Sequence, residues 1–95
     1  MDRVGISFQA AHTAEELRVQ FIRPLRTALE AARAGVYSNY LHQVAEHPGQ
    51  ATEHLLVFEV NDFRVALRLL RTQLEKLNPP ELVDFHNLNP SNLPY

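Results

Sequence analysis

Imidazole side chains bind metals and move protons at neutral pH, and this chain has five of them. They are His12, His42, His47, His54 and His86. His42 and His54 flank the turn-forming pair Pro48-Gly49, so they could face each other across a hairpin. A metal site needs several converging ligands, however, and no two histidines have the four-residue spacing of one helix face. Isolated histidines are more typical of exposed or hydrogen-bonded residues, and we predict no metal and no cofactor.

A second set of residues could perform acid–base chemistry. Asp84 and His86 are two positions apart and would share one face of a strand, and Glu59 could share that face on a neighbouring strand. A carboxylate and an imidazole in one pocket can act as general acid and base. The polar outer face of a sheet is the more common setting for such residues. The sequence therefore weighs against an enzyme without excluding one.

Arginine dominates the basic residues, with eight arginines and one lysine. Three arginines recur at helical spacing and could form an anion-binding surface. These are Arg64, Arg68 and Arg71. A solvated helix face with i,i+4 ion pairs, Arg71 with Glu75 and Arg26 with Glu30, is the favoured alternative. The net charge of −2 argues against nucleic acid or an anionic membrane as the partner, so we expect neither.

The composition limits the class of protein. Of the 95 residues, 45% are hydrophobic and 21% are charged, which is ordinary for a globular chain of one domain. No apolar run approaches the length needed to cross a bilayer. The first residues lack a cationic stretch followed by an apolar segment, and the chain has no cysteine. We therefore expect a cytoplasmic protein without disulfides.

Four segments are predicted to be β-strands, the first and last from apolar–polar alternation with a period of two and the middle two from apolar stretches on either side of the Pro48-Gly49 turn. They are Arg3–Phe8, Val36–Val44, Leu55–Val60 and Leu82–His86. In the third segment the even-numbered residues from Leu56 to Val60 would face one way. The odd-numbered residues from Leu55 to Glu59 would face the other way, and these too are apolar at the start.

Two apolar stripes at helical spacing predict helices between these strands. The first helix begins at a capping box, Thr13–Glu16, and stops at Gly35. We expect Pro24 to kink this helix, and a second helix that restarts at Pro24 is the alternative. The second is capped by Asn61 or Asp62 and stops at Pro79-Pro80. The resulting order is β-α-β-β-α-β, an α+β fold of the ferredoxin-like type. We expect two helices on one face of a four-stranded antiparallel sheet, in a single domain at 1–87 followed by an irregular tail at 88–95.

The helical segments resemble those of small uncharacterised bacterial proteins with a ferredoxin-like fold. In such proteins a proline-interrupted helix is joined to a strand-helix unit that ends in Leu-x-x-Pro. The matching segments here are Pro24–Ala32, Ala66–Arg71 and Leu77–Pro80, within a span from Leu17 to Phe85. The glycine-rich start of the second strand is represented only by Gly35. The resemblance implies the fold and, because some of these proteins are partners of secreted toxins, a protein partner.

Apolar residues that remain after the core has been assigned indicate an interface. They are Leu55 and Val57 on the uncovered face of the sheet, and Val65 and Leu69 on the outer side of the second helix. Either the tail covers the open face through Leu93 and Tyr95, or a second copy of the chain does. We predict a non-enzymatic protein-interaction module that forms a homodimer or binds a protein partner. The alternative is a small-molecule-binding regulatory or enzyme-like domain that uses Glu59, Asp84 and His86.

Overall fold

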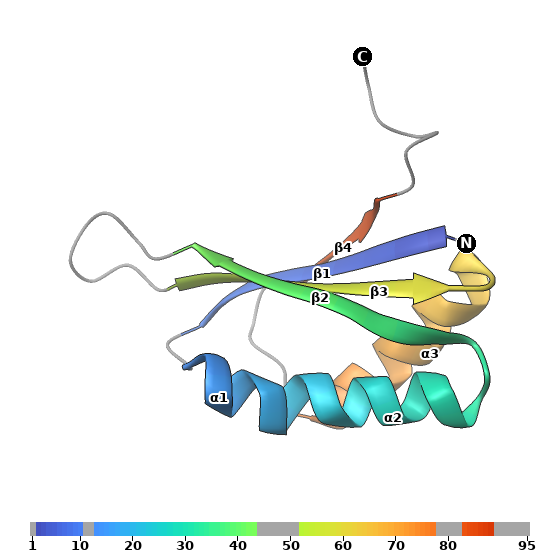
Figure 1. The fold of residues 1–95 in the computed structure, drawn as a ribbon, viewed down its shortest axis with the longest axis horizontal. Helices are drawn as coiled ribbons and strands as arrows, with labels where there is room; N and C mark the ends of the chain where they lie inside the picture. The colour runs from blue at the N-terminus through green and yellow to red at the C-terminus, as the bar shows by residue number, and fades with distance from the viewer. Residues whose placement is uncertain (1, 11–12, 44–51, 78–82, 89–95) are drawn as a thin grey trace, which may run out of the picture.

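The computed structural model describes residues 2–10, 13–43, 52–77 and 83–88, which form an antiparallel sheet with helices on one face (Figure 1). Its strands are β1 (Asp2–Ala10), β2 (Gly35–Gln43), β3 (Thr52–Val60) and β4 (Val83–Asn87). The order across the sheet is β2-β3-β1-β4, so β1 and β3 are inner strands and β2 and β4 are edges. This arrangement confirms the ferredoxin-like fold predicted from the sequence.

The first helical segment is continuous, but it changes from an α-helix to a π-helix and back to an α-helix. It comprises α1 (Ala14–Leu17), a π-helical turn η1 (Arg18–Ile22) and α2 (Arg23–Ala31). The predicted capping box is present, because Thr13 and Glu16 each accept a hydrogen bond from the other's backbone amide. Pro24 lies in the first turn of α2. The wider π-helical turn directly precedes this proline, whose ring would clash with the carbonyl four residues earlier in a regular helix.

The end of α2 corrects the sequence prediction, which assigned the helix stop to Gly35. Arg33 takes the left-handed conformation instead, with a φ of 54°. The amides of Arg33 and Ala34 donate to carbonyls of the last helical turn, which is the paired pattern of a Schellman motif. Gly35 begins β2, where a Cβ atom would collide with the carbonyl oxygen of Glu59. The close approach of β2 to β3 therefore requires this glycine.

The second helix, α3 (Phe63–Glu75), begins as the sequence indicates. Asp62, rather than Asn61, is the N-cap, and its carboxylate accepts a hydrogen bond from the Val65 amide. The helix ends at Glu75, and the predicted stop at Pro79-Pro80 lies outside the described residues. No helix of the described residues is long and apolar enough to span a membrane.

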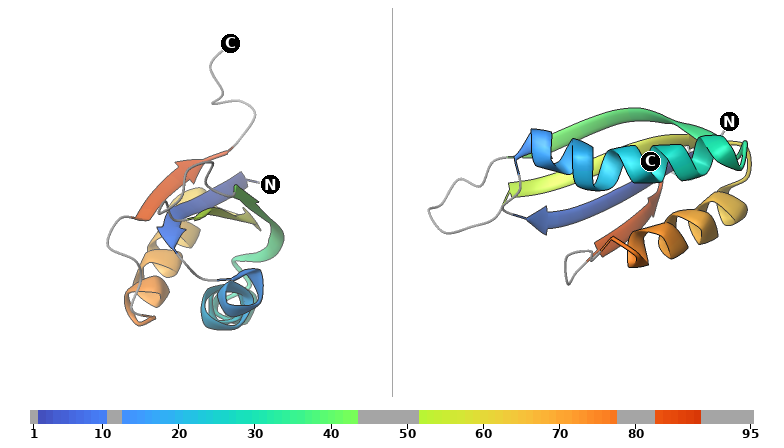
Figure 2. Two further views of the ribbon diagram at one scale, coloured as in Figure 1. Left: turned by 90° about the vertical axis from the view of Figure 1, so that its left-hand side faces the viewer. Right: turned by 90° about the horizontal axis from the view of Figure 1, so that it is seen from below.

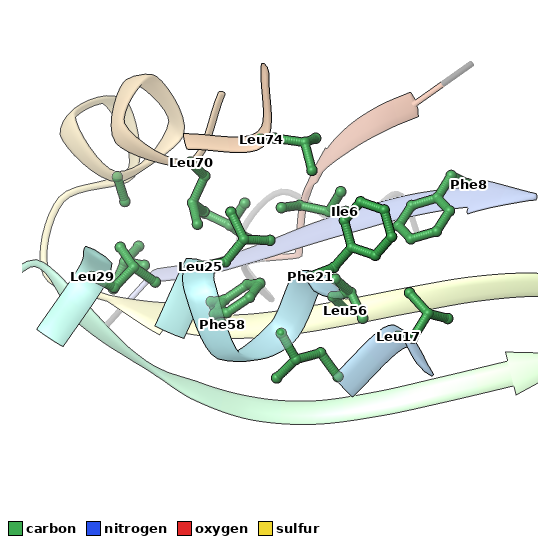
Figure 3. Close-up of a cluster of buried hydrophobic side chains, with 14 of the residues drawn as sticks. Ile6, Phe8, Leu17, Phe21, Leu25, Leu29, Leu56, Phe58, Leu70 and Leu74 are labelled. Carbon is green, nitrogen blue, oxygen red and sulfur yellow. The ribbon is translucent and has the colours of Figure 1, made fainter. Parts of the chain in front are cut away.

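Both helical segments lie against the same face of the sheet (Figure 2). The first runs along the β2 side, and α3 runs along the β4 side. Their apolar residues meet the inward-facing residues of β1 and β3 in one core (Figure 3). The fully buried members are Val4, Ile6, Leu17, Leu25, Leu29, Leu56, Phe58, Val60, Ala66 and Leu70. The predicted division of β3 into two faces is confirmed by these positions.

Strand β2 contains a bulge that the sequence analysis did not predict. The register with β3 shifts between Tyr37 and Asn39, so Ser38 is an extra residue. Tyr37 and Tyr40 are three residues apart, yet each lies opposite a core residue of β3 and packs against the core. The predicted turn at Pro48-Gly49 lies outside the described residues.

We expect Leu70→Ala to lower the free energy of unfolding by about 2–5 kcal/mol, because it leaves a cavity where a fully buried side chain joins α3 to the core. Val65→Ala is the matched control on the same helix, since Val65 is 59% exposed and should change stability by less than about 0.5 kcal/mol. Urea unfolding followed by circular dichroism measures both. Equal losses for the two variants would contradict this packing of α3.

Candidate functional site

The sheet face without helices is apolar on its β2 side. Leu55 and Val57 lie there as the sequence predicts, with Leu55 partly exposed and Val57 9% exposed. Leu41 of β2 is the cross-strand partner of Leu55 and is 51% exposed. Val36, on the same side of β2, is 43% exposed. Val36, Leu41 and Leu55 together form the apolar edge patch.

Leu88, the first residue of the predicted tail, covers another part of this face. A Cβ atom on Gly5 would lie 2.8 Å from Leu88 Cδ1 and 3.2 Å from Leu55 Cδ1. The lack of a side chain at Gly5 therefore makes room for both leucines. Leu93 and Tyr95, which would cover the face in one of the two predicted alternatives, lie outside the described residues. Leu88 therefore covers the part of the face around Gly5 of β1.

A shallow hollow of about 250 Å³ adjoins the apolar edge patch. It is lined by Leu41, His42, Gln43, Glu53 and Leu55. These residues come from the ends of β2 and β3, and the hollow is open to solvent. Small-molecule pockets usually enclose most of their ligand in a larger volume. The hollow is better suited to a side chain projecting from a partner protein.

The two edge strands differ in how they are protected against pairing with other chains. Natural edges are protected by short length, charged residues, proline or bulges. Strand β4 has five residues and carries Asp84. Strand β2 has nine residues without a charge or a proline, and its one protective device is the bulge at Ser38. β2 is therefore the less protected of the two edges.

The three residues of the acid–base hypothesis share the open face but do not form one cluster. Strand β1 lies between β3 and β4, so Glu59 is not on a strand neighbouring Asp84 and His86, which corrects the sequence prediction. Glu59 pairs with Arg3 of β1 at 3.5 Å. His86 instead meets Ser7 of β1, with its Nε2 atom 2.6 Å from the serine Oγ. Asp84 is the cross-strand partner of Ser7.

Ser7 is the polar residue of this face that the sequence analysis missed. A hydroxyl hydrogen-bonded to an imidazole is the first element of a nucleophile–base pair. Such a pair also needs a group that orients the imidazole and donors for an oxyanion. Within the described residues no hydrogen bond joins Asp84 to His86, and His86 is exposed. The contact therefore fits a structural link between β1 and β4 better than a catalytic pair.

His42 and His54 are cross-strand partners, as the sequence predicts. His54 is only 1% exposed, and its Nε2 atom lies 3.1 Å from the carbonyl oxygen of Ala10. Because a carbonyl can only accept, Nε2 carries the proton, and Tyr40 donates its hydroxyl to Nδ1 over 2.7 Å. Both ring nitrogens are thus occupied. Among the described residues no group of three potential ligands is placed to hold a metal.

The Tyr40 ring stacks with both histidines. Its centroid is 5.6 Å from that of His42 and 5.9 Å from that of His54. Burial raises the pKa of the Tyr40 phenol above its usual value, and nearby Tyr37 adds to the increase. Burial also raises the pKa of Tyr37, against an opposing effect of Arg18. Tyr40 therefore remains a protonated donor to His54 throughout the neutral range.

The four residues predicted to form an interaction surface fall on two surfaces. Leu55 and Val57 belong to the open face of the sheet. Val65 is 59% exposed on α3, and Leu69 on the same helix packs partly against the core. Helix α3 also carries the predicted anion-binding residues. These are Arg64, Arg68 and Arg71, and all three are exposed.

Comparison with known proteins identifies the fold. No family model and no curated protein matches the sequence. Among solved structures, the chain is similar to the ligand-free regulatory subunit of aspartate kinase from Thermus thermophilus, with a TM-score of 0.50 and 13% sequence identity. The similarity covers 90% of this chain and 50% of that chain, so this chain spans half the length of the matched protein. At this identity the match shows a shared fold.

We expect Tyr40→Phe to lower the free energy of unfolding by about 1–3 kcal/mol, because it leaves a buried His54 nitrogen without its donor. Tyr37→Phe makes the same change on the same strand. The Tyr37 hydroxyl has no hydrogen bond within the described residues, so its loss should cost less than about 0.5 kcal/mol. Urea unfolding at neutral pH compares the variants. A Tyr40→Phe protein as stable as Tyr37→Phe would rule out an important Tyr40–His54 bond.

Proposed function

We propose that this protein is a non-enzymatic interaction module that pairs its β2 edge with a strand of another protein chain. The observation that carries the proposal is a nine-residue edge strand without charge, on which Val36 and Leu41 are 43% and 51% exposed. In strand addition, backbone hydrogen bonds supply affinity and alternate side chains supply specificity. The apolar edge patch and its adjoining hollow provide contacts for those side chains.

The partner in this proposal is a second copy of the chain or a different protein. A chain of 95 residues buries a small core, and association is a common supplement to the stability of such proteins. The resemblance to small bacterial proteins that act with secreted toxins makes a toxin the first heterologous candidate. Both kinds of partner would use the same edge of the sheet.

The proposal is tested with two double variants that place lysines at matched apolar sites. Val36→Lys with Leu41→Lys alters β2, whereas Val19→Lys with Val65→Lys alters helical sites that are 48% and 59% exposed. We expect the β2 variant to weaken self-association or partner binding by about tenfold or more, or about 1.4 kcal/mol, because it charges the interface. Sedimentation velocity and affinity capture measure the two modes, and the helical variant should behave as the wild type.

Two results would contradict this proposal. One is a wild-type chain that stays monomeric at high concentration and captures no protein from its source. The other is an equal loss of binding in both double variants, which would place the interface away from β2. In a supporting result, backbone amides of β2 would also exchange more slowly with solvent in the complex.

A second candidate function, small-molecule-binding regulation, is favoured by the structural similarity to a regulatory subunit. The Arg3–Glu59 and Ser7–His86 pairs on the open face would supply its polar contacts. A ligand at ten times its Kd stabilises a protein by about 1.4 kcal/mol, which raises Tm by several degrees at this size. We expect a thermal-shift screen of metals and common metabolites to find such a shift, and His86→Ala to remove it. A screen without any shift would eliminate this candidate.

A further inference from the structure

Helix α3 carries three exposed arginines along one flank. Arg64, Arg68 and Arg71, here called the arginine row, occupy positions i, i+4 and i+7. This spacing places them on one side of the helix, with steps of about 6.0 and 4.5 Å along its axis. The core-facing stripe of α3 contains Ala66, Leu70 and Leu74. The packing of these residues in the core therefore fixes which side of α3 the arginine row occupies.

The described part of the chain does not neutralise the arginine row. Within the described residues no carboxylate lies at ion-pair distance from any of its members. Arg26 and Glu30 form the predicted i,i+4 pair at 3.1 Å, but Arg71 does not pair in this way with Glu75. The Arg71 guanidinium lies over the Phe85 ring instead, 5.1 Å from its centre. Like charges at this spacing repel, so a partner with negative charge would relieve the repulsion.

The position of the row separates it from the β2 edge. Phe85 belongs to β4, the strand at the opposite edge of the sheet from β2. The views in Figure 2 place α3 on the β4 side of the helical layer. A molecule bound to the arginine row would therefore leave the apolar edge patch free.

We propose that the arginine row binds an acidic helix of a partner protein. An antiparallel helix with carboxylates at positions i, i+3 and i+7 has steps of about 4.5 and 6.0 Å, which match the row read in reverse. An extended strand repeats the side chains of one face every 6.6–6.8 Å or so and would match only one of the two steps. Arginine also suits carboxylates because its planar group can form two parallel hydrogen bonds with them.

Charge favours this protein partner over nucleic acid. Affinity for nucleic acid grows with the number of phosphates that are neutralised, and the chain as a whole has a net charge of −2. Three arginines on one flank offer few such contacts. A short acidic helix needs only three carboxylates to neutralise the row. The inference is independent of the proposed function, because it concerns the other side of the molecule.

The test measures binding of a fluorescent helical peptide with glutamates at i, i+3 and i+7 by anisotropy. We expect Arg68→Glu to weaken binding by about tenfold or more, because it reverses the central charge of the row. Arg23→Glu makes the same change at an exposed site at the start of α2 and should alter binding by less than about twofold. Arg68→Gln, which removes the charge without reversing it, should give an intermediate loss. Added salt should weaken binding to the wild type.

Several outcomes would overturn the proposal. A peptide of the same composition with three consecutive glutamates should bind several-fold more weakly, and equal affinity would mean that net charge alone is recognised. Tighter binding of a single-stranded DNA of equal charge would assign the row to nucleic acid. No binding of the glutamate peptide to the wild type, or equal losses in Arg68→Glu and Arg23→Glu, would exclude this site. Circular dichroism confirms that each variant is folded.

Discussion

The helices cover only one face of the sheet, because both helical segments lie on the same side of it. The cross-strand partners Ile6 and Leu56 are fully buried on that side. The next residues along the two strands, Ser7 and Leu55, are also partners and face the other way. A shift of the strand pairing by one residue would move the buried residues to the open face and the exposed residues into the core. Burial of Ile6 and Leu56 therefore fixes the position of Ser7 and Leu55 on the open face. The surfaces left for binding are the open face, the two edges and the outer flanks of the helices.

The β2 edge and the arginine row would bind partners through different kinds of interaction. The β2 edge offers unpaired backbone groups and apolar side chains, so binding there should depend weakly on salt. The arginine row offers charge, so binding there should fall as ionic strength rises. A protein with both surfaces can hold two different partners without competition between them. The shared fold with a regulatory subunit does not decide between these roles, because one fold serves many functions.

The fold could be predicted from the sequence because its local signals agree. Period-two alternation and apolar runs bounded by turn residues identified four strands, and the caps at Thr13 and at Asn61 or Asp62 identified where the helices begin. The helix stop was wrong because Gly35 can serve either a turn or a close approach of strands, and only the packed structure shows which applies. Nothing in the sequence indicated that Arg33 would adopt the left-handed conformation.

The candidate surfaces were less predictable than the fold, because they depend on which strands are neighbours. Alternation places Ser7 and His86 on one face, but their contact requires β4 to lie beside β1. The same order separates Glu59 from β4. The arginine row could be read from helical spacing alone. The contact of Arg71 with Phe85, in place of the predicted pair with Glu75, could not, because it depends on the position of β4 relative to α3.

The bulge in β2 determines where this chain could lose a residue without a change in the direction of its side chains. Asn39 and Tyr40 pair with Val57 and Leu56, the two β3 residues that directly precede Phe58, the partner of Tyr37, so loss of Ser38 would restore regular alternation. Both tyrosines would still face the helices, whereas loss of one residue in the middle of an inner strand would turn half of that strand over. The shortened edge would be flatter and less twisted. Its backbone would then be more open to pairing with another chain, so the extra residue limits pairing at this edge.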